Sequence, residues 1–127
     1  MTTYDFGDGN GPVPAHQHAN GGGWIADTVV YDDTVYIGPD ALVYGNAWVV
    51  DHAWVYGNSH VCGNAWVGHE AQVFDLAVIE GNARIDRESR VYESAIVRGD
   101  AQLCGCCFFH GTAVVEGNEI LDDEERY

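Results

Sequence analysis

Apolar side chains recur at every sixth position from Ile25 to Leu121, without an insertion or deletion in between. Two positions before each of those from Tyr31 to Val115 lies a second residue, which is Ala in most repeats and Val, Ser or Cys in the others. A period of six matches neither an α-helix, which repeats about every 3.6 residues, nor a single strand, which alternates about every two. The pattern predicts short strands joined by tight turns, with the apolar and the small side chain of each repeat facing one core.

A second and threefold longer period overlies the first, because one type of turn recurs in every third repeat. Gly permits the positive φ of a sharp turn, and Asn tolerates it. Stacked Asn side chains can also hydrogen-bond from one coil to the next. One coil therefore comprises three strands and three corners, which predicts an all-β, triangular solenoid of parallel strands with about five coils. The recurring pairs are Gly45-Asn46, Gly63-Asn64, Gly81-Asn82, Gly99-Asp100 and Gly117-Asn118.

Three repeat units, which span residues 43–48, 55–60 and 79–84, read Val-Tyr-Gly-Asn-Ala-Trp, Val-Tyr-Gly-Asn-Ser-His and Ile-Glu-Gly-Asn-Ala-Arg. They resemble the hexapeptide-repeat, left-handed parallel β-helix superfamily, and the resemblance covers residues 25–121. It implies left-handed coiling and, commonly, a homotrimer. The superfamily includes acyltransferases, γ-type carbonic anhydrases and non-enzymatic solenoids, so the repeat by itself implies a fold and not a function.

The periodic region divides the chain into three segments. Residues 1–24 are rich in Gly, Pro, Asp and Asn and are expected to form a loop-rich N-terminal cap. Residues 25–121 form the hexapeptide β-helix, and residues 122–127 form an acidic C-terminal tail or cap. Caps are expected because the end of a solenoid is an unpaired strand edge that would otherwise recruit other chains.

Charge and cysteine content narrow the possible partners. The formal net charge is −15 with only five Lys and Arg residues, which argues against nucleic acid and anionic membranes as partners. An apolar run of the length that spans a membrane is absent from the sequence, and so is a signal-peptide pattern. The four Cys residues lack zinc-site spacing, so we expect reduced thiols and a cytoplasmic protein.

The N-terminal segment contains one candidate metal site. His16 and His18 are two residues apart, so in an extended segment both imidazoles point the same way and can approach one ion. The alternative is a surface loop with two solvated or hydrogen-bonded His side chains. A metal ion at this pair is the one cofactor that the sequence suggests.

A candidate ligand site lies on the second face of the predicted prism. Trp48, Trp66 and Arg84 follow one another at the spacing of one coil, which predicts aromatic stacking and a cation–π contact. The ladder either stabilises the fold alone or offers a platform to a planar or sugar-like ligand, with Gly68 leaving room beside Trp66.

Two columns of outward side chains are candidates for a subunit interface. One column is aliphatic and the other aromatic, and contiguous patches of this kind usually mark association. We expect both to be buried between the protomers of a homotrimer. The residues are Leu42, Val78, Ile96 and Val114 in the first column and Tyr56, Phe74, Tyr92 and His110 in the second.

Evidence for catalysis in the sequence is weak. Four His residues could act as a base, but none has an obvious acidic partner in sequence, no loop interrupts the repeat, and a basic patch for a phosphorylated cofactor is lacking. The spacing of the His residues also differs from that of a γ-type carbonic anhydrase. The leading hypothesis is a non-enzymatic homotrimeric solenoid that is structural or captures a small molecule between subunits. The alternative is an acyltransferase-like enzyme with an interfacial His base, for which the candidates are His52, His60, His69 and His110.

Overall fold

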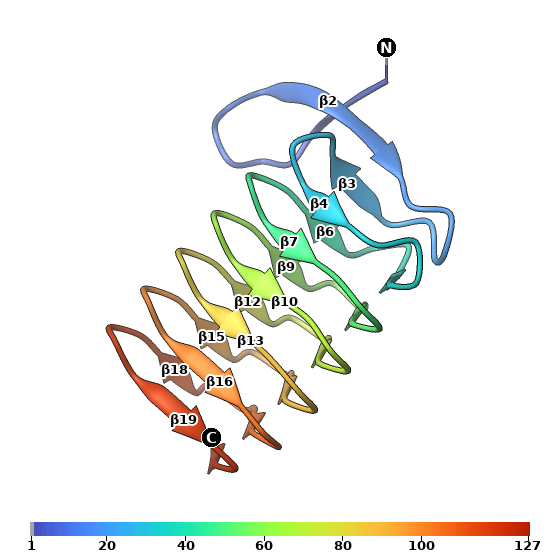
Figure 1. Ribbon diagram of the computed structural model, residues 1–127. Coiled ribbons are helices and arrows are strands. Elements are labelled where there is room, and N and C mark those ends of the chain that lie inside the picture. Colours follow the sequence, from blue (N-terminus) through green and yellow to red (C-terminus); the bar gives the residue numbers. More distant parts are fainter. Residues whose placement is uncertain (1) are drawn as a thin grey trace.

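The computed structural model describes residues 2–127, which form a parallel β-solenoid (Figure 1). The strands lie on three faces, and two of the faces contain six strands each, so the coil makes about six turns. Within the described residues all regular elements are strands, and most strands of one coil pair with the strands three repeats further along the chain. The predicted all-β solenoid with three repeats per coil is therefore confirmed, with about one coil more than expected.

The first face carries the N-terminal hairpin and the strands that follow it in spatial order. They are β1 (Thr3–Asp5), β2 (Pro12–Gln17), β3 (Trp24–Ala26), β6 (Leu42–Val43), β9 (His60–Val61), β12 (Val78–Ile79), β15 (Ile96–Val97) and β18 (Val114–Val115).

The second face consists of β4 (Val30–Tyr31), β7 (Trp48–Val49), β10 (Trp66–Val67), β13 (Arg84–Ile85), β16 (Gln102–Cys104) and β19 (Ile120–Asp122). The third consists of β5 (Tyr36–Ile37), β8 (Trp54–Val55), β11 (Gln72–Val73), β14 (Arg90–Val91), β17 (Phe108–Phe109) and β20 (Glu125–Arg126).

The hand of the coil can be followed in Figure 1. Strands β7, β10, β13 and β16 lie in front and run toward the lower right, while successive coils progress toward the lower left. Seen along the axis from the N-terminal end, the chain therefore turns anticlockwise as it advances, which defines a left-handed screw. The solenoid is therefore left-handed, as predicted.

The core is one column of inward side chains on each face. The second residue of each two-residue strand on the first face, such as Val61, Ile79 and Val97, is completely buried and pairs with its equivalent in the next coil. The small residues beside them are buried as well, and Ser59 satisfies its hydroxyl by donating to the Tyr56 carbonyl at 2.8 Å. Each coil thus buries its apolar groups against its neighbours, which is the main source of stability in a solenoid.

The Gly-Asn corner is stacked closely enough to require glycine. Gly45 has a φ of 71°, and a Cβ atom at this position would lie 2.9 Å from the backbone nitrogen of Gly63 in the next coil. The predicted side-chain ladder is present, because the Asn64 amide donates to Asn82 at 3.3 Å and Asn82 donates to Asp100 at 2.9 Å.

The N-terminal cap contains more strand than its composition suggested. β1 and β2 form an antiparallel hairpin, and β2 pairs antiparallel with β3 across the N-terminal end of the prism (Figure 1). Phe6 and Ala15 are buried and close the core. Strand formation outweighs the loop-forming composition here because the hairpin supplies backbone partners to an edge that would otherwise be open.

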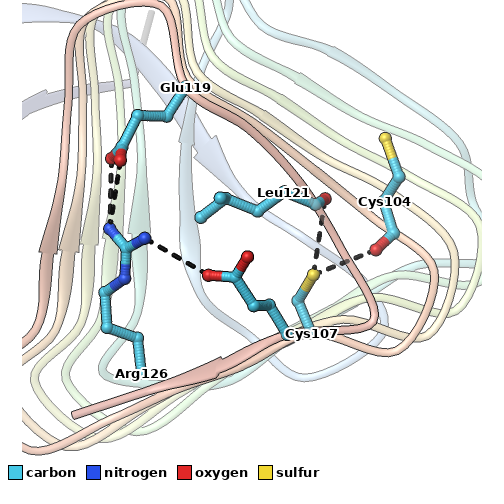
Figure 2. Close-up of polar contacts among 6 residues, drawn as sticks. Cys104, Cys107, Glu119, Leu121 and Arg126 are labelled. Carbon is cyan, nitrogen blue, oxygen red and sulfur yellow. Dashed lines mark hydrogen bonds and ion pairs between the residues drawn. The ribbon is translucent and has the colours of Figure 1, made fainter.

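Residues 122–127, expected as an acidic tail, continue the coil. β20 pairs with β17 so that Arg126 lies opposite Phe109. Arg126 follows Phe109 by one residue fewer than the full coil that separates other paired residues on this face. This shift places Arg126 at an inward position. Figure 2 shows its side chain crossing the triangular section toward Glu119, with which it pairs at 3.1 Å. A second ion pair joins Arg126 to Glu124 at 3.2 Å.

In the same layer, the Cys107 thiol donates to the Cys104 carbonyl at 3.0 Å (Figure 2).

Candidate functional site

A hollow on the prism follows the corner between the second and third faces. This corner groove has a volume of about 550 Å³. The groove is lined by Asp51, His52, His69, Glu70, Arg87, Glu88, Gly105 and Cys106.

A hydrogen-bonded His–Asp pair lies at this corner. The Nδ1–H of His69 donates to Oδ1 of Asp86, and the same oxygen accepts the backbone N–H of Arg87 at 2.7 Å. Asp86 is only 9% exposed. The carboxylate therefore fixes the ring of His69 and leaves Nε2 as the nitrogen directed away from Asp86.

Sequence analysis did not find this pair. Asp86 falls one position short of a full coil after His69, so the two are not stacked equivalents. The one signal in the sequence was that position 86 lies one full coil after Gly68, which directly precedes His69 in the chain, so Asp86 is close to His69 in the column pattern.

The predicted cation–π contact is present beside the groove. β10 and β13 pair with Trp66 opposite Arg84, and the guanidinium carbon lies 4.2 Å from the ring centroid. Arg84 also approaches Asp86 at 3.7 Å. Trp66, Arg84, Asp86 and His69 thus form one connected cluster, whose geometry is set by two adjacent coils.

Gly68 has a different role from the one predicted. A Cβ atom there would lie 2.2 Å from Cη2 of Trp66, so the indole itself occupies the space above Gly68. That space belongs to the fold and is not left for a ligand. The predicted stacking of Trp48 on Trp66 is not found among the described residues: the two are paired through the backbones of β7 and β10, and the Trp48 side chain remains 48% exposed. In the part of the chain that the structure describes, the ring contacts of Trp66 are with Arg84 and His69.

The His16 and His18 side chains are engaged in hydrogen bonds. His16 donates from Nδ1 to Asp27 at 2.7 Å and contacts the Tyr31 hydroxyl through Nε2 at 3.0 Å. His18 is 4% exposed and donates from Nε2 to the Val35 carbonyl at 2.9 Å. Among residues 2–127 there is no cluster of three or more His, Cys, Asp or Glu side chains arranged around a possible metal ion. The geometry favours the alternative in which both imidazoles support the cap.

The aromatic column predicted as an interface stacks on itself within the chain. Neighbouring ring centroids lie 4.9, 4.9, 5.0 and 5.2 Å apart along Tyr56, Phe74, Tyr92, His110 and Tyr127. The first face presents the aliphatic column, where Leu42, Val78 and Ile96 are partly buried and Val114 is 40% exposed. His60 lies in that column, and burial lowers its pKa.

The cysteines near the groove are not activated as nucleophiles. The Cys106 thiol donates to Glu88 at 3.3 Å, and this hydrogen bond together with nearby carboxylates raises its pKa. Burial raises the pKa of Cys104. Both thiols are therefore neutral near pH 7, and a thiolate would be needed for nucleophilic attack.

Comparison with family models, curated proteins and solved structures finds no match to this chain. Residues 2–127 contain no helix with the length and apolarity needed to cross a membrane. The assignment of function therefore depends on the geometry of the chain itself.

Proposed function

We propose that the chain is a non-enzymatic, homotrimeric hexapeptide-repeat solenoid that binds a small polar molecule in the cytoplasm. The observation that carries this proposal is the corner groove of about 550 Å³ beside the Trp66–Arg84–Asp86–His69 cluster. Its volume lies in the range of small-molecule sites, roughly 300–1,000 Å³. The side chains at its base are held by contacts within the chain, so little ordering would be needed on binding.

The lining favours a ligand with several hydrogen-bonding groups. His52, His69 and Arg87 offer N–H donors, whereas Glu70 and Glu88 offer acceptors. Donors and acceptors therefore lie close together along the corner, which suits a polar ligand that carries both kinds of group. Trp66 and Arg84 lie on the second face next to the groove, and the exposed ring of Trp48 is available to the next protomer.

The proposed trimer brings together the first and third faces of neighbouring prisms. The aliphatic column of Leu42, Val78, Ile96 and Val114 supplies the apolar area on one side. The edges of the stacked aromatic column supply the other. Sedimentation should show a trimer at micromolar concentration, and Ile96→Glu together with Phe74→Glu should convert it to monomers. A wild-type monomer would contradict the assembly.

Ligand binding can be tested by a thermal-shift screen against nucleotides, sugars and acyl-CoA, followed by tryptophan fluorescence titration. A ligand of the groove should raise Tm. Glu88→Gln and His69→Gln should each lower its affinity by about tenfold, since a lost hydrogen bond to a charged group costs about 1.5–3 kcal/mol. Ser94→Ala is the matched control, because Ser94 holds the same corner position as Glu88 on another edge. Equal weakening in the control would contradict binding at the groove.

A second candidate function is acyl transfer with His69 as the general base. The observation that favours it is the hydrogen bond between His69 Nδ1 and Asp86, which leaves Nε2 free to accept a proton. This arrangement supplies the acidic partner that was not evident from sequence. Acyl-CoA turnover that is abolished by His69→Gln, and reduced less by His52→Gln, would support the enzyme over the binding protein.

A further inference from the structure

A second cavity lies between the N-terminal hairpin and the first Gly-Asn corner. It has a volume of about 360 Å³ and is more enclosed than the corner groove. The loop between β1 and β2 forms its roof, and the corner after β6 forms its floor. The lining residues that matter here are Phe6, Val13 and Tyr44 on the walls and Asp8, Asn10 and Asp27 on the rim.

The walls are apolar and firmly held. Phe6 is 5% exposed and stacks on Tyr44 with ring centroids 4.9 Å apart. Burial raises the pKa of the Tyr44 phenol, so this side chain stays neutral near pH 7. Val13 and Pro14 come from β2, which is paired on both sides by β1 and β3. The side of the cavity formed by β2, Phe6 and Tyr44 is therefore preformed by strand pairing and ring stacking.

The rim carries two carboxylates. Asp8 accepts the backbone N–H and the side-chain amide of Asn10, at 3.1 and 3.0 Å. Asp27 binds His16 through Oδ1, and within residues 2–127 its Oδ2 has no hydrogen-bond partner from a side chain. Both acids are thus held in place, with acceptor capacity left for a cation.

The charge distribution along the chain adds to the negative electrostatic potential at this cavity. All five basic residues are Arg and lie between Arg84 and Arg126, whereas residues 1–83 contain ten acidic residues and no Lys or Arg. The N-terminal end of the prism is therefore surrounded by uncompensated negative charge. A field of this kind attracts small cations and repels anions.

We propose that this N-terminal cavity binds a small organic cation, in which an ammonium group is attached to an apolar ring or short chain. The apolar part occupies the space between Phe6, Val13 and Tyr44, and the ammonium group pairs with Asp8 and Asp27. The hairpin then has two roles, because it closes the end of the solenoid and encloses the ligand. This site is separate from the corner groove and does not depend on it.

The test is isothermal titration of the full chain with three probes that share one ring and differ in charge. Phenethylamine is the cation, 2-phenylethanol the neutral analogue and phenylacetate the anion. Phenethylamine should bind saturably and about tenfold or more tightly than 2-phenylethanol, because a charge-assisted hydrogen bond contributes about 1.5–3 kcal/mol. Phenylacetate should not bind.

Three variants and one control variant locate the site. Asp8→Asn and Asp27→Asn should each lower the affinity for phenethylamine by about tenfold and leave the affinity for 2-phenylethanol unchanged. Asp33→Asn is the matched control, because Asp33 is an exposed acid at the same end of the prism but outside the cavity lining. Val13→Phe should block both probes by filling the cavity, and circular dichroism confirms that each variant remains folded.

Several outcomes would overturn the proposal. Equal affinity for phenethylamine and 2-phenylethanol would show that charge has no role. If Asp33→Asn lowered the affinity for phenethylamine as much as Asp8→Asn does, the ligand would be attracted by the overall negative charge and not by a defined site. Displacement of phenethylamine by calcium, with tighter binding of calcium, would show that the loop prefers an inorganic ion.

Discussion

The two ends of the prism are closed by different kinds of interaction. At the N-terminal end, an antiparallel hairpin continues the sheet of the first face beyond β3, and backbone hydrogen bonds from Gly23 to Ile37 and from Ile37 to Asn20 cover the edge of the third face. At the C-terminal end, the inward side chain of Arg126 crosses the last coil and pairs with Glu119 and Glu124 (Figure 2). One end is closed mainly by backbone hydrogen bonds and apolar burial, and the other mainly by ion pairs.

The difference teaches how a parallel solenoid can end. An interior coil is hydrogen-bonded to the coils on both sides, as when Ile96 and Arg98 of β15, which also pairs with β12, donate to the carbonyls of Ala113 and Val115 in the next coil, so each end of the stack leaves one edge without strand partners. An end can be covered by a reversed strand, which pairs with the edge, or by side chains that only cover the core. The first solution is insensitive to salt, whereas the second should weaken as salt screens the charges.

The largest expected effect follows from opening the N-terminal end. Phe6→Ala removes a buried ring that closes the core and stacks on Tyr44. We expect a loss of about 3 kcal/mol in the free energy of unfolding, since truncation of a buried Phe typically costs about 3–5 kcal/mol. Urea unfolding measures it, and a loss under about 1 kcal/mol would show that the hairpin is not part of the cooperative unit.

A smaller effect is expected at the C-terminal end. Arg126→Met keeps much of the aliphatic cover over Phe109 but removes both ion pairs. The side chain is partly exposed, so we expect a loss of about 1 kcal/mol. Unfolding in low and high salt provides the test, because the wild type should lose this increment in high salt and the variant should not. Equal salt dependence of both proteins would contradict the proposed closure.

The smallest effect concerns pH at the same end. His110 donates from Nδ1 to Glu93 at 3.1 Å and from Nε2 to Glu125 at 2.9 Å, and it stacks between Tyr92 and Tyr127. The hydrogen bond to Glu125, with that to Glu93, raises the pKa of His110. The stabilisation is then complete below the unfolded-state pKa of about 6.5 and is lost as pH rises through the higher folded-state pKa.

Hydrogen exchange of the β20 amides can detect this loosening. Intrinsic exchange rates also change with pH, so protection factors should be compared, and they should fall above the folded-state pKa in the wild type. In His110→Gln they should be lower at acidic pH and nearly independent of pH. The amides of β2 at the other end serve as the internal control, and a parallel fall there would indicate global destabilisation.

The columns of the candidate sites were predictable, but most of the contacts within them were not. The Trp66–Arg84 contact follows from the coil spacing, because strand pairing places residues one full coil apart side by side. The hydrogen bond between His69 and Asp86 joins residues that are one position short of a full coil apart, and it depends on the positive φ of 53° at His69. The occupation of the Gly68 space by Trp66 depends on a side-chain rotamer, which the repeat does not encode.

The sequence by itself determined the coil of this protein. Its period of six places Val and Ala inward, and its longer period of three repeats places the Gly-Asn pairs at one corner, because only glycine fits where Gly45 meets Gly63. Tertiary structure decided what lies where the repeat ends or shifts. The hairpin over β3 and the inward turn of Arg126 arise from backbone pairing and from an offset that is one position short of a full coil. Both cover end coils that lack a neighbour on one side. A periodic pattern is the same in every coil, so it does not encode how these ends are covered.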